Sequence, residues 1–349
     1  MQLLNVLHAY SITDERARSL VRAVSEGSAR SLGMGGRGVV FLTRDCNLKC
    51  RYCRALGACE PIPASRLGAI LEEWCDHGCR HLHLTGGEPT THPEIVPIAT
   101  LASDLGLRMS MSTNGTADPD LYESLIERGL GYIYLSFDSF DEARFDSIVG
   151  VGGSFRKVTE TIRRITALRD AGRAEVYLTI NIVVYDENFS EIERLIQGAL
   201  ELRPDDFKLI PTTRFLDRTT PEQKESIRRL IAGTRDVQRR FPFFAYRLEH
   251  LEGMRGLEDP RYRGIRCYLP LDERTVDGEH CYPCSIYKRE RGAPLGPADE
   301  PYEKQTERVL EFLQTHRPGE DPICSRFCCD ITRDFNLLVH RRLAEMCLV

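Results

Sequence analysis

The chain has 349 residues, of which 42% are hydrophobic and 28% charged, and 47 Lys and Arg against 52 Asp and Glu give a formal net charge of −5. This composition is typical of a globular protein of two or three domains, and the acidic balance argues against a general nucleic-acid binder. No run of 18 apolar residues occurs, which excludes a membrane-spanning helix. The N-terminus lacks a basic segment followed by an apolar run, so we expect no secretory signal and a cytoplasmic location.

The residue pattern predicts a short helical lead-in followed by a regular alternation of strands and helices. The lead-in covers residues 1–36. Six strand–helix pairs then follow in chain order: 38–43 with 64–77, 81–85 with 93–105, 108–113 with 118–128, 132–138 with 154–171, 175–184 with 189–202, and 207–212 with 221–240. Such pairs, joined by right-handed crossovers, favour a parallel α/β sheet curved into a partial (β/α)6 barrel.

The predicted strands are polar on one face. Alternate residues of three strands carry polar groups, among them Ser110 and Ser112, then Tyr134, Ser136 and Asp138, then Tyr177, Thr179 and Asn181. The covering helices need the apolar faces, so the polar faces should line the barrel. Closed barrels fill their interior with branched aliphatic side chains, so this lining predicts a cavity for a polar ligand. Tyr134 and Asn181 are the candidate catalytic residues of that lining.

The alternation stops near residue 240, beyond which the chain is rich in Pro, Arg, Gly and Cys. We therefore expect three units: the lead-in 1–36, the barrel 37–240 and a small Cys-rich unit 241–349.

Thirteen cysteines indicate metal or iron–sulfur ligation, because a long chain without a signal is not a secreted disulfide scaffold. They form an N-terminal group (Cys46, Cys50, Cys53) and a C-terminal group (Cys267, Cys281, Cys284, Cys324, Cys328, Cys329, Cys347). The three between them, Cys59, Cys75 and Cys79, are expected to be small buried residues.

The segment Cys46-Asn-Leu-Lys-Cys50-Arg-Tyr-Cys53 directly follows the first predicted strand. Three thiolates can hold three irons of a [4Fe–4S] cube, which leaves one iron for an outside ligand, whereas ferredoxins supply a fourth Cys. With Tyr52 before its last Cys, this segment resembles the hallmark of the radical S-adenosylmethionine (SAM) superfamily. The resemblance implies that Cys46, Cys50 and Cys53 hold the SAM-binding [4Fe–4S] cluster.

Further motifs of the same superfamily follow in order at the ends of the next strands. Thr85-Gly86-Gly87-Glu88-Pro89 is similar to the segment that binds the SAM amino group through its backbone and its Glu. Ser112-Thr113-Asn114-Gly115 and Ser136-Phe137-Asp138-Ser139 resemble strand ends that contact SAM. The resemblance therefore implies that the SAM-binding residues are Tyr52, Gly86, Gly87, Glu88, Ser112, Asn114, Ser136 and Asp138. It covers residues 38 to about 240, with one departure: Val149-Gly150 stands where relatives often have Arg-Gly.

The C-terminal cysteines resemble the SPASM/Twitch extensions that hold auxiliary [4Fe–4S] clusters. Cys267 and the segment Asp277-Gly278 to Pro283-Cys284 carry this likeness. It implies one auxiliary cluster on Cys267, Cys284, Cys324 and Cys328, with Cys281 and Cys329 as alternates and Cys347 only if the tail is held in place. A structural zinc site on four thiolates is the competing interpretation.

Together these motifs predict an enzyme that cleaves SAM reductively and abstracts hydrogen from a polar small molecule, helped by an external one-electron donor such as flavodoxin or ferredoxin. An auxiliary cluster that accepts an electron favours dehydrogenation. Epimerisation or decarboxylation, with Cys281 first among the spare thiol donors, and modification of a ribosomal peptide remain the alternatives. The 36 residues before the barrel are too few for a leader-binding domain, which places small molecules first. Lys208 and Arg214 could bind a substrate anion, with a surface salt bridge as the equal alternative.

Overall fold

The structure is a computed structural model that describes residues 13–28, 32–54, 60–212, 220–249, 251, 256–257, 262 and 264–345. Cys59, Arg214, Cys347 and residues 1–12 of the lead-in lie outside the described residues. In the barrel region the strands are β1 Arg37–Phe41, β2 His81–Thr85, β3 Arg108–Thr113, β4 Leu130–Ser136, β5 Tyr177–Val184 and β6 Asp206–Pro211. Six neighbouring strands pair in parallel in the order β6-β5-β4-β3-β2-β1.

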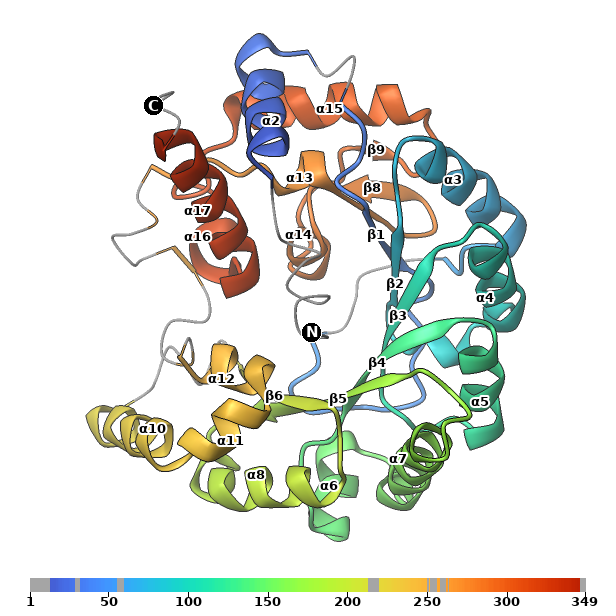
Figure 1. Ribbon diagram of the computed structural model, residues 1–349, viewed down its shortest axis with the longest axis vertical. Coiled ribbons are helices and arrows are strands. Elements are labelled where there is room, and N and C mark those ends of the chain that lie inside the picture. The colour runs from blue at the N-terminus through green and yellow to red at the C-terminus, as the bar shows by residue number, and fades with distance from the viewer. Residues whose placement is uncertain are drawn as a thin grey trace.

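Helices cover the outer face of this curved sheet (Figure 1). They are α3 Ala64–Asp76, α4 Ile95–Asp104, α5 Pro119–Glu127, α6 Glu142–Val149, α7 Ser154–Asp170 and α8 Ile192–Glu201, with short 3-10 turns η1 Pro89–Thr91 and η2 Phe189–Glu191. Helices α10 Pro221–Gly233, α11 Arg235–Arg240 and α12 Pro242–Glu249 lie beside the edge strand β6 (Figure 1). The predicted α/β class with a parallel sheet and partial barrel is confirmed.

Two local signals escaped the sequence prediction. Asp141 accepts a hydrogen bond from the Arg144 backbone N at 2.8 Å and starts helix α6, which ends at Gly150 with φ 72°. The predicted helix 221–240 is divided into α10 and α11 at Gly233-Thr234, since glycine is a poor helix-interior residue.

The core lies between the sheet and its outer helices, as the alternation of side chains predicts. Leu82, Leu84, Ile133 and Leu135 are each at most 1% exposed and belong to one apolar cluster. Burying a side chain of this size stabilises the fold by roughly 1.5–3 kcal/mol. The polar residues on the opposite strand face are left to line the barrel interior.

The chain beyond residue 240 continues the same sheet. β7 Glu273–Val276 pairs in parallel with β1, and β8 His280–Tyr282 and β9 Gly296–Pro297 extend the sheet antiparallel. The helices of this part are α13 Leu269–Asp272, α14 Ser285–Arg289, α15 Tyr302–Thr315, α16 Cys324–Phe327 and α17 Asp330–Glu345. The division at 240 stays a prediction, and the sheet runs across it.

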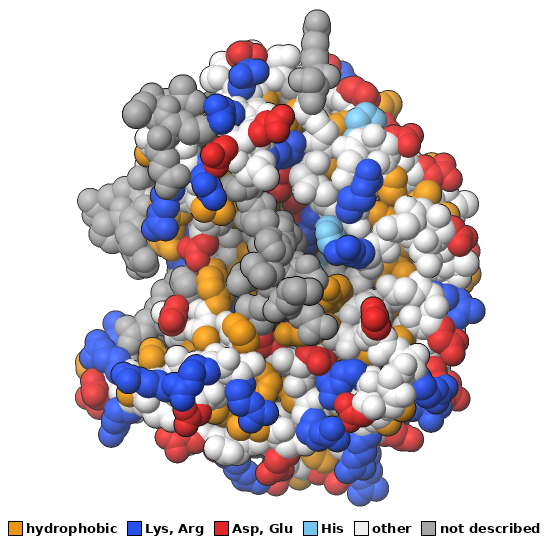
Figure 2. Space-filling model, viewed as in Figure 1, with side chains coloured by type: hydrophobic (Ala, Val, Ile, Leu, Met, Phe, Trp, Pro, Cys, Tyr) orange, Lys and Arg blue, Asp and Glu red, His pale blue; other side chains and the backbone are white. Residues whose placement is uncertain are grey.

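Helix α2 Asp14–Glu26 packs with the C-terminal helices. Leu20 shares a buried cluster with Leu310 of α15 and with Phe335 and Val339 of α17. The lead-in therefore lies in space beside the end of the chain (Figure 1). Over the face shown in Figure 2, Lys and Arg side chains are interspersed with Asp and Glu, as the near-balanced composition requires. No helix among the described residues is both long and apolar enough to cross a bilayer.

Candidate functional site

A cavity of about 1640 Å³ occupies the barrel. Its lining includes residues of all six barrel strands, the 44–54 loop, helix α14 and residues 326–331. The predicted residues Tyr134, Asn181, Ser112, Ser136 and Asp138 all line it. Most of the polar strand faces therefore meet in one hollow, as their alternation predicts, but Tyr177 and Thr179 of β5 are not among the lining residues.

The three N-terminal thiols, here called the loop cysteines (Cys46, Cys50, Cys53), line this cavity together. Their loop is held by helix α6, since the Lys49 backbone N donates to the Val149 carbonyl at 2.8 Å and the Arg51 N to the Ile148 carbonyl at 3.1 Å. The sequence departure at Val149-Gly150 thus lies at the support of the loop. Burial raises the pKa of Cys50 to about 12, and the nearby Asp138 carboxylate and the other two thiols act in the same direction.

The segment Gly86-Gly87-Glu88-Pro89, here called the GGEP segment, contacts the 44–54 loop that carries the loop cysteines. The Gly87 N donates to the Thr43 carbonyl and the Glu88 N to the Asp45 carbonyl, both at 2.7 Å. A Cβ on Gly86, whose φ is +145°, would lie 2.4 Å from the Thr43 carbonyl oxygen, and a Cβ on Gly87 would lie 2.3 Å from that of Asp45. These contacts require the glycines because two backbone segments touch, whereas the sequence suggested close approach to a ligand.

Glu88 connects this segment to the end of β3. Its carboxylate is 1% exposed. Oε1 accepts hydrogen bonds from the Thr90 N at 3.1 Å and from the hydroxyls of Thr90 and Thr113, both at 2.7 Å, and Oε2 accepts one from the Asn114 N at 2.6 Å. Burial raises the pKa of Glu88, and these hydrogen bonds oppose that shift. Oε2 keeps one acceptor site that an ammonium could use.

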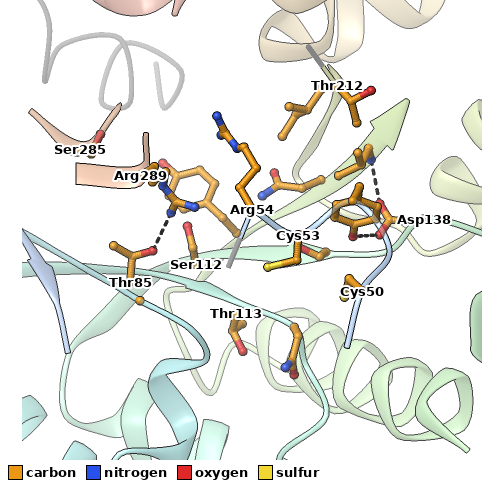
Figure 3. A pocket seen from close by; sticks show the side chains of 18 of the residues that line it. Cys50, Cys53, Arg54, Thr85, Ser112, Thr113, Asp138, Thr212, Ser285 and Arg289 are labelled. Carbon is orange, nitrogen blue, oxygen red and sulfur yellow. Dashed lines mark hydrogen bonds between the residues drawn. The ribbon is translucent and has the colours of Figure 1, made fainter. Parts of the chain in front are cut away.

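Other predicted SAM contacts form hydrogen bonds around the loop cysteines. Asn114 donates from Nδ2 to the Asn47 Oδ1 at 2.8 Å and lies 3.9 Å from the Cys46 sulfur. The Tyr52 hydroxyl donates to Asp138, whose other oxygen accepts from the Val183 N at 2.7 Å. Burial raises the pKa of Asp138 to about 6. Figure 3 shows Asp138 beside Cys50 in this part of the cavity.

Residues from the C-terminal part also reach the cavity, which the sequence prediction missed. Arg289 of α14 donates to the Thr85 hydroxyl at 3.1 Å, opposite Cys53 in Figure 3. Arg54 forms an ion pair with Glu290. Nothing local in the sequence signals these contacts, because each joins segments more than 200 residues apart.

His83 of β2 lies inside the barrel and lines the cavity. Its Nδ1 lies 2.8 Å from the Ser110 hydroxyl and its Nε2 3.2 Å from that of Ser112. Burial lowers the pKa of His83, and the positive charges of Arg37, Arg289 and Lys208 lower it further. The imidazole is therefore neutral and the surroundings are electropositive.

The four cysteines proposed from the sequence as auxiliary ligands are here called the C-terminal thiol group: Cys267, Cys284, Cys324 and Cys328. All four are free and partly buried, and Cys324 and Cys328 begin and follow helix α16. Burial raises the pKa of Cys328, and the charges of Cys267, Cys284, Cys324 and Cys329 raise it further. The Asn336 Nδ2 lies 3.6 Å from the Cys267 sulfur. Cys329 borders both this group and the main cavity, which it lines.

Cys281 is placed differently from its predicted roles. It is 1% exposed within the apolar core and is not among the residues that line the cavity. Burial raises its pKa to about 11. Cys281 belongs to a different apolar cluster from those against which the C-terminal thiol group packs. Cys79 is fully buried, as predicted, and Cys75 is half-buried.

The donor set of the loop cysteines fits a three-ligand iron–sulfur cluster, because three unpaired thiols share one cavity wall beside the GGEP segment. Among the described residues, no three His, Cys, Asp or Glu side chains are grouped as a single metal ion would need. Thiols that each bind a different iron of a cube stand further apart than the ligands of one ion.

Comparisons with known proteins agree with this geometry. Residues 40–198 match the model of the Radical SAM superfamily. The chain is 32% identical over 197 residues to an AdoMet-dependent heme synthase of Methanosarcina barkeri, covering 53% of this chain and 54% of that protein. It is 30% identical over 167 residues to a PqqA peptide cyclase of Rhizobium meliloti, covering 46% and 43%. The chain thus spans about half the length of the curated relatives it matches.

Among solved structures, Streptococcus suis SuiB bound to S-adenosylmethionine has a similar fold, with a TM-score of 0.61, 16% identity, and coverage of 90% of this chain and 75% of that one. At this identity the likeness concerns the fold alone. The matched region, the loop cysteines and the GGEP segment agree with one another: residues 40–198 form a Radical SAM domain.

Proposed function

We propose that this enzyme oxidises a polar small molecule by removing two hydrogens. The observation that carries the proposal is the convergence, in one polar cavity, of the loop cysteines, the GGEP segment and the strand-end residues. When bound there, a [4Fe–4S] cluster and SAM would supply an electron and a 5′-deoxyadenosyl radical that abstracts hydrogen from an unactivated C–H bond.

The chain's own residues position these groups. The loop cysteines hold the cluster, and the free acceptor site of Glu88 Oε2 receives the SAM ammonium. Tyr52, Ser112, Asn114, Ser136 and Asp138 surround the rest of SAM, while Tyr134 and Asn181 face the substrate. The walls of the barrel shield the radical from bulk water.

Oxidation needs an acceptor for the second electron. We assign this role to an auxiliary [4Fe–4S] cluster on the C-terminal thiol group, which neighbours the cavity through Cys329. When both groups are bound, the substrate would lose one hydrogen atom to the 5′-deoxyadenosyl radical, one proton to a base or water, and one electron to that cluster. An external donor such as flavodoxin or ferredoxin supplies the first electron. The placement of Cys281 away from the cavity disfavours epimerisation with that thiol as hydrogen donor.

Peptide modification is the second candidate. A relative at 30% identity is a PqqA peptide cyclase. The cavity of about 1640 Å³ also exceeds the 300–1,000 Å³ of a usual small-molecule site. SAM and a cluster would fill part of that excess, so the small molecule stays first.

The proposal is tested in two steps with anaerobically reconstituted protein. With dithionite and SAM it should release 5′-deoxyadenosine, and replacing all three loop cysteines by Ala should abolish release. Undiminished release from that variant would disprove the assignment. A panel of sugars and aminocyclitols in D2O then distinguishes the reactions by mass spectrometry. Oxidation yields a product lighter by two hydrogens without deuterium at the reacting carbon, whereas epimerisation leaves the formula unchanged and adds one deuterium.

A further inference from the structure

Lys208 on β6 places an ammonium group inside the barrel cavity. Its Nζ lies 4.6 Å from the ring centroid of Tyr134 and 4.7 Å from that of Phe243. Among the described residues no side chain or carbonyl oxygen accepts a hydrogen bond from it, so two aromatic rings are its surroundings. Ring faces attract a cation but leave its three N–H donors unsatisfied.

The two acidic groups near Lys208 have partners of their own, although one buried oxygen of Asp330 accepts no hydrogen bond from the described residues. The Asp206 carboxylate accepts hydrogen bonds from two backbone N–H groups at the start of α12, from the Phe243 N at 2.9 Å and from the Phe244 N at 3.2 Å. Asp330 forms a buried ion pair with Arg247 at 2.6 Å. Burial lowers the pKa of Lys208 to about 7, and the nearby Arg247 acts in the same direction, whereas Asp330 and Asp206 oppose the shift. An anionic ligand in the cavity would therefore stabilise the protonated form of Lys208.

Asn181 supplies the second half of the site. It pairs with Lys208 in the parallel register of β5 and β6, so the two side chains lie on the same sheet face. Asn181 is 9% exposed, and its buried Oδ1 has no hydrogen-bond partner in the described part of the chain. An unpaired acceptor therefore adjoins an unpaired cation, and both belong to the lining of the cavity.

We propose that this pair recognises a carboxylate with a hydroxyl or amine on the adjacent carbon of the substrate. Lys208 binds the carboxylate, and Asn181 Oδ1 accepts a hydrogen bond from the neighbouring hydroxyl or amine. The two arginines that act on Lys208 are each paired with an acid, Arg37 with Glu273 and Arg247 with Asp330. The charge of Lys208 that remains matches the single charge of a carboxylate better than that of a phosphate dianion. The inference rests on the proposed function, because it names the class of substrate for that site.

The test measures binding without turnover, by calorimetry on anaerobically reconstituted enzyme with SAM and no reductant. The probes are mandelate, mandelamide, which lacks the charge, and phenylacetate, which lacks the hydroxyl. We expect mandelate to bind the enzyme at least about tenfold more tightly than either, the size of one charge-assisted hydrogen bond. Lys208→Met should remove the preference over mandelamide, and Asn181→Leu the preference over phenylacetate. Lys224→Met, on α10 outside the cavity lining, should change neither preference.

Three outcomes would overturn the inference: no mandelate binding to the enzyme, tighter binding of inorganic phosphate than of mandelate, or an unchanged preference in Lys208→Met. The inference would also be overturned if Lys208→Met lost as much affinity for SAM as for mandelate, because Lys208 would then bind SAM and not the substrate. Release of 5′-deoxyadenosine by the same preparation tests the proposed function separately. Met keeps the apolar contact with the Tyr134 and Phe243 rings and removes a buried amine, so Lys208→Met should not lower the thermal midpoint of the enzyme. A lowered midpoint would indicate a structural role.

Discussion

Replacing Glu88 by Ala should destabilise the protein as well as weaken SAM binding. The carboxylate is 1% exposed and accepts backbone hydrogen bonds from Thr90 and Asn114 in addition to two hydroxyls. The hydroxyls can turn to other partners, but the two backbone N–H groups cannot. Each buried donor without an acceptor costs roughly 1–3 kcal/mol, so we expect a loss of about 2–6 kcal/mol in the free energy of unfolding. That is a large share of the roughly 5–15 kcal/mol typical of a folded domain.

The assay is urea unfolding of the protein without added iron or SAM, followed by circular dichroism. Glu160→Ala is the matched control, because Glu160 is exposed on α7, and it should change stability by no more than about 0.5 kcal/mol. Glu88→Gln should lose less than Glu88→Ala, since one oxygen still accepts. If Glu88→Ala unfolds like the control, the carboxylate does not connect the GGEP segment to β3 and our reasoning is refuted.

Three further predictions concern the backbone, the metal and the pH dependence. Gly87→Ala should displace the 44–54 loop and so reduce the iron content after reconstitution, because the added Cβ would lie 2.3 Å from the Asp45 carbonyl oxygen. The control Gly152→Ala should keep the wild-type iron content, because a Cβ there has no atom within 4 Å. Iron analysis should find about eight irons per chain, and the variant with all three loop cysteines replaced by Ala should keep about half of them. Zinc instead of iron in that variant would contradict the auxiliary cluster. Burial raises the pKa of Asp206 from 3.8 to about 6, so the folded state binds the extra proton in that window, and stability should fall as pH rises through it. Unfolding curves of Asp206→Asn should lack this part of the slope, and an equal slope in both proteins would contradict the shift.

Much of the barrel could be predicted from the sequence because its signals are local. Alternating apolar residues such as Leu82 and Leu84 identify a strand within β2 whatever surrounds it, and β2 His81–Thr85 and β3 Arg108–Thr113 lie at their predicted positions. The motifs carrying the loop cysteines and Glu88 are likewise contiguous. Parallel strands bring their carboxyl ends to one edge, so these motifs had to meet at one cavity.

The contacts between distant segments required the tertiary structure. Three features depend on how the chain beyond residue 240 folds back on the barrel. They are the parallel pairing of β7 with β1, the contact of Arg289 with Thr85, and the place of Cys281 in the apolar core of the barrel. The same holds for Lys208: the sequence places it on a strand, but only the packing of α12 and α17 engages the acids around it and leaves its ammonium unpaired. Periodicity reports which way a side chain faces, whereas its partners are set by segments that no local pattern connects.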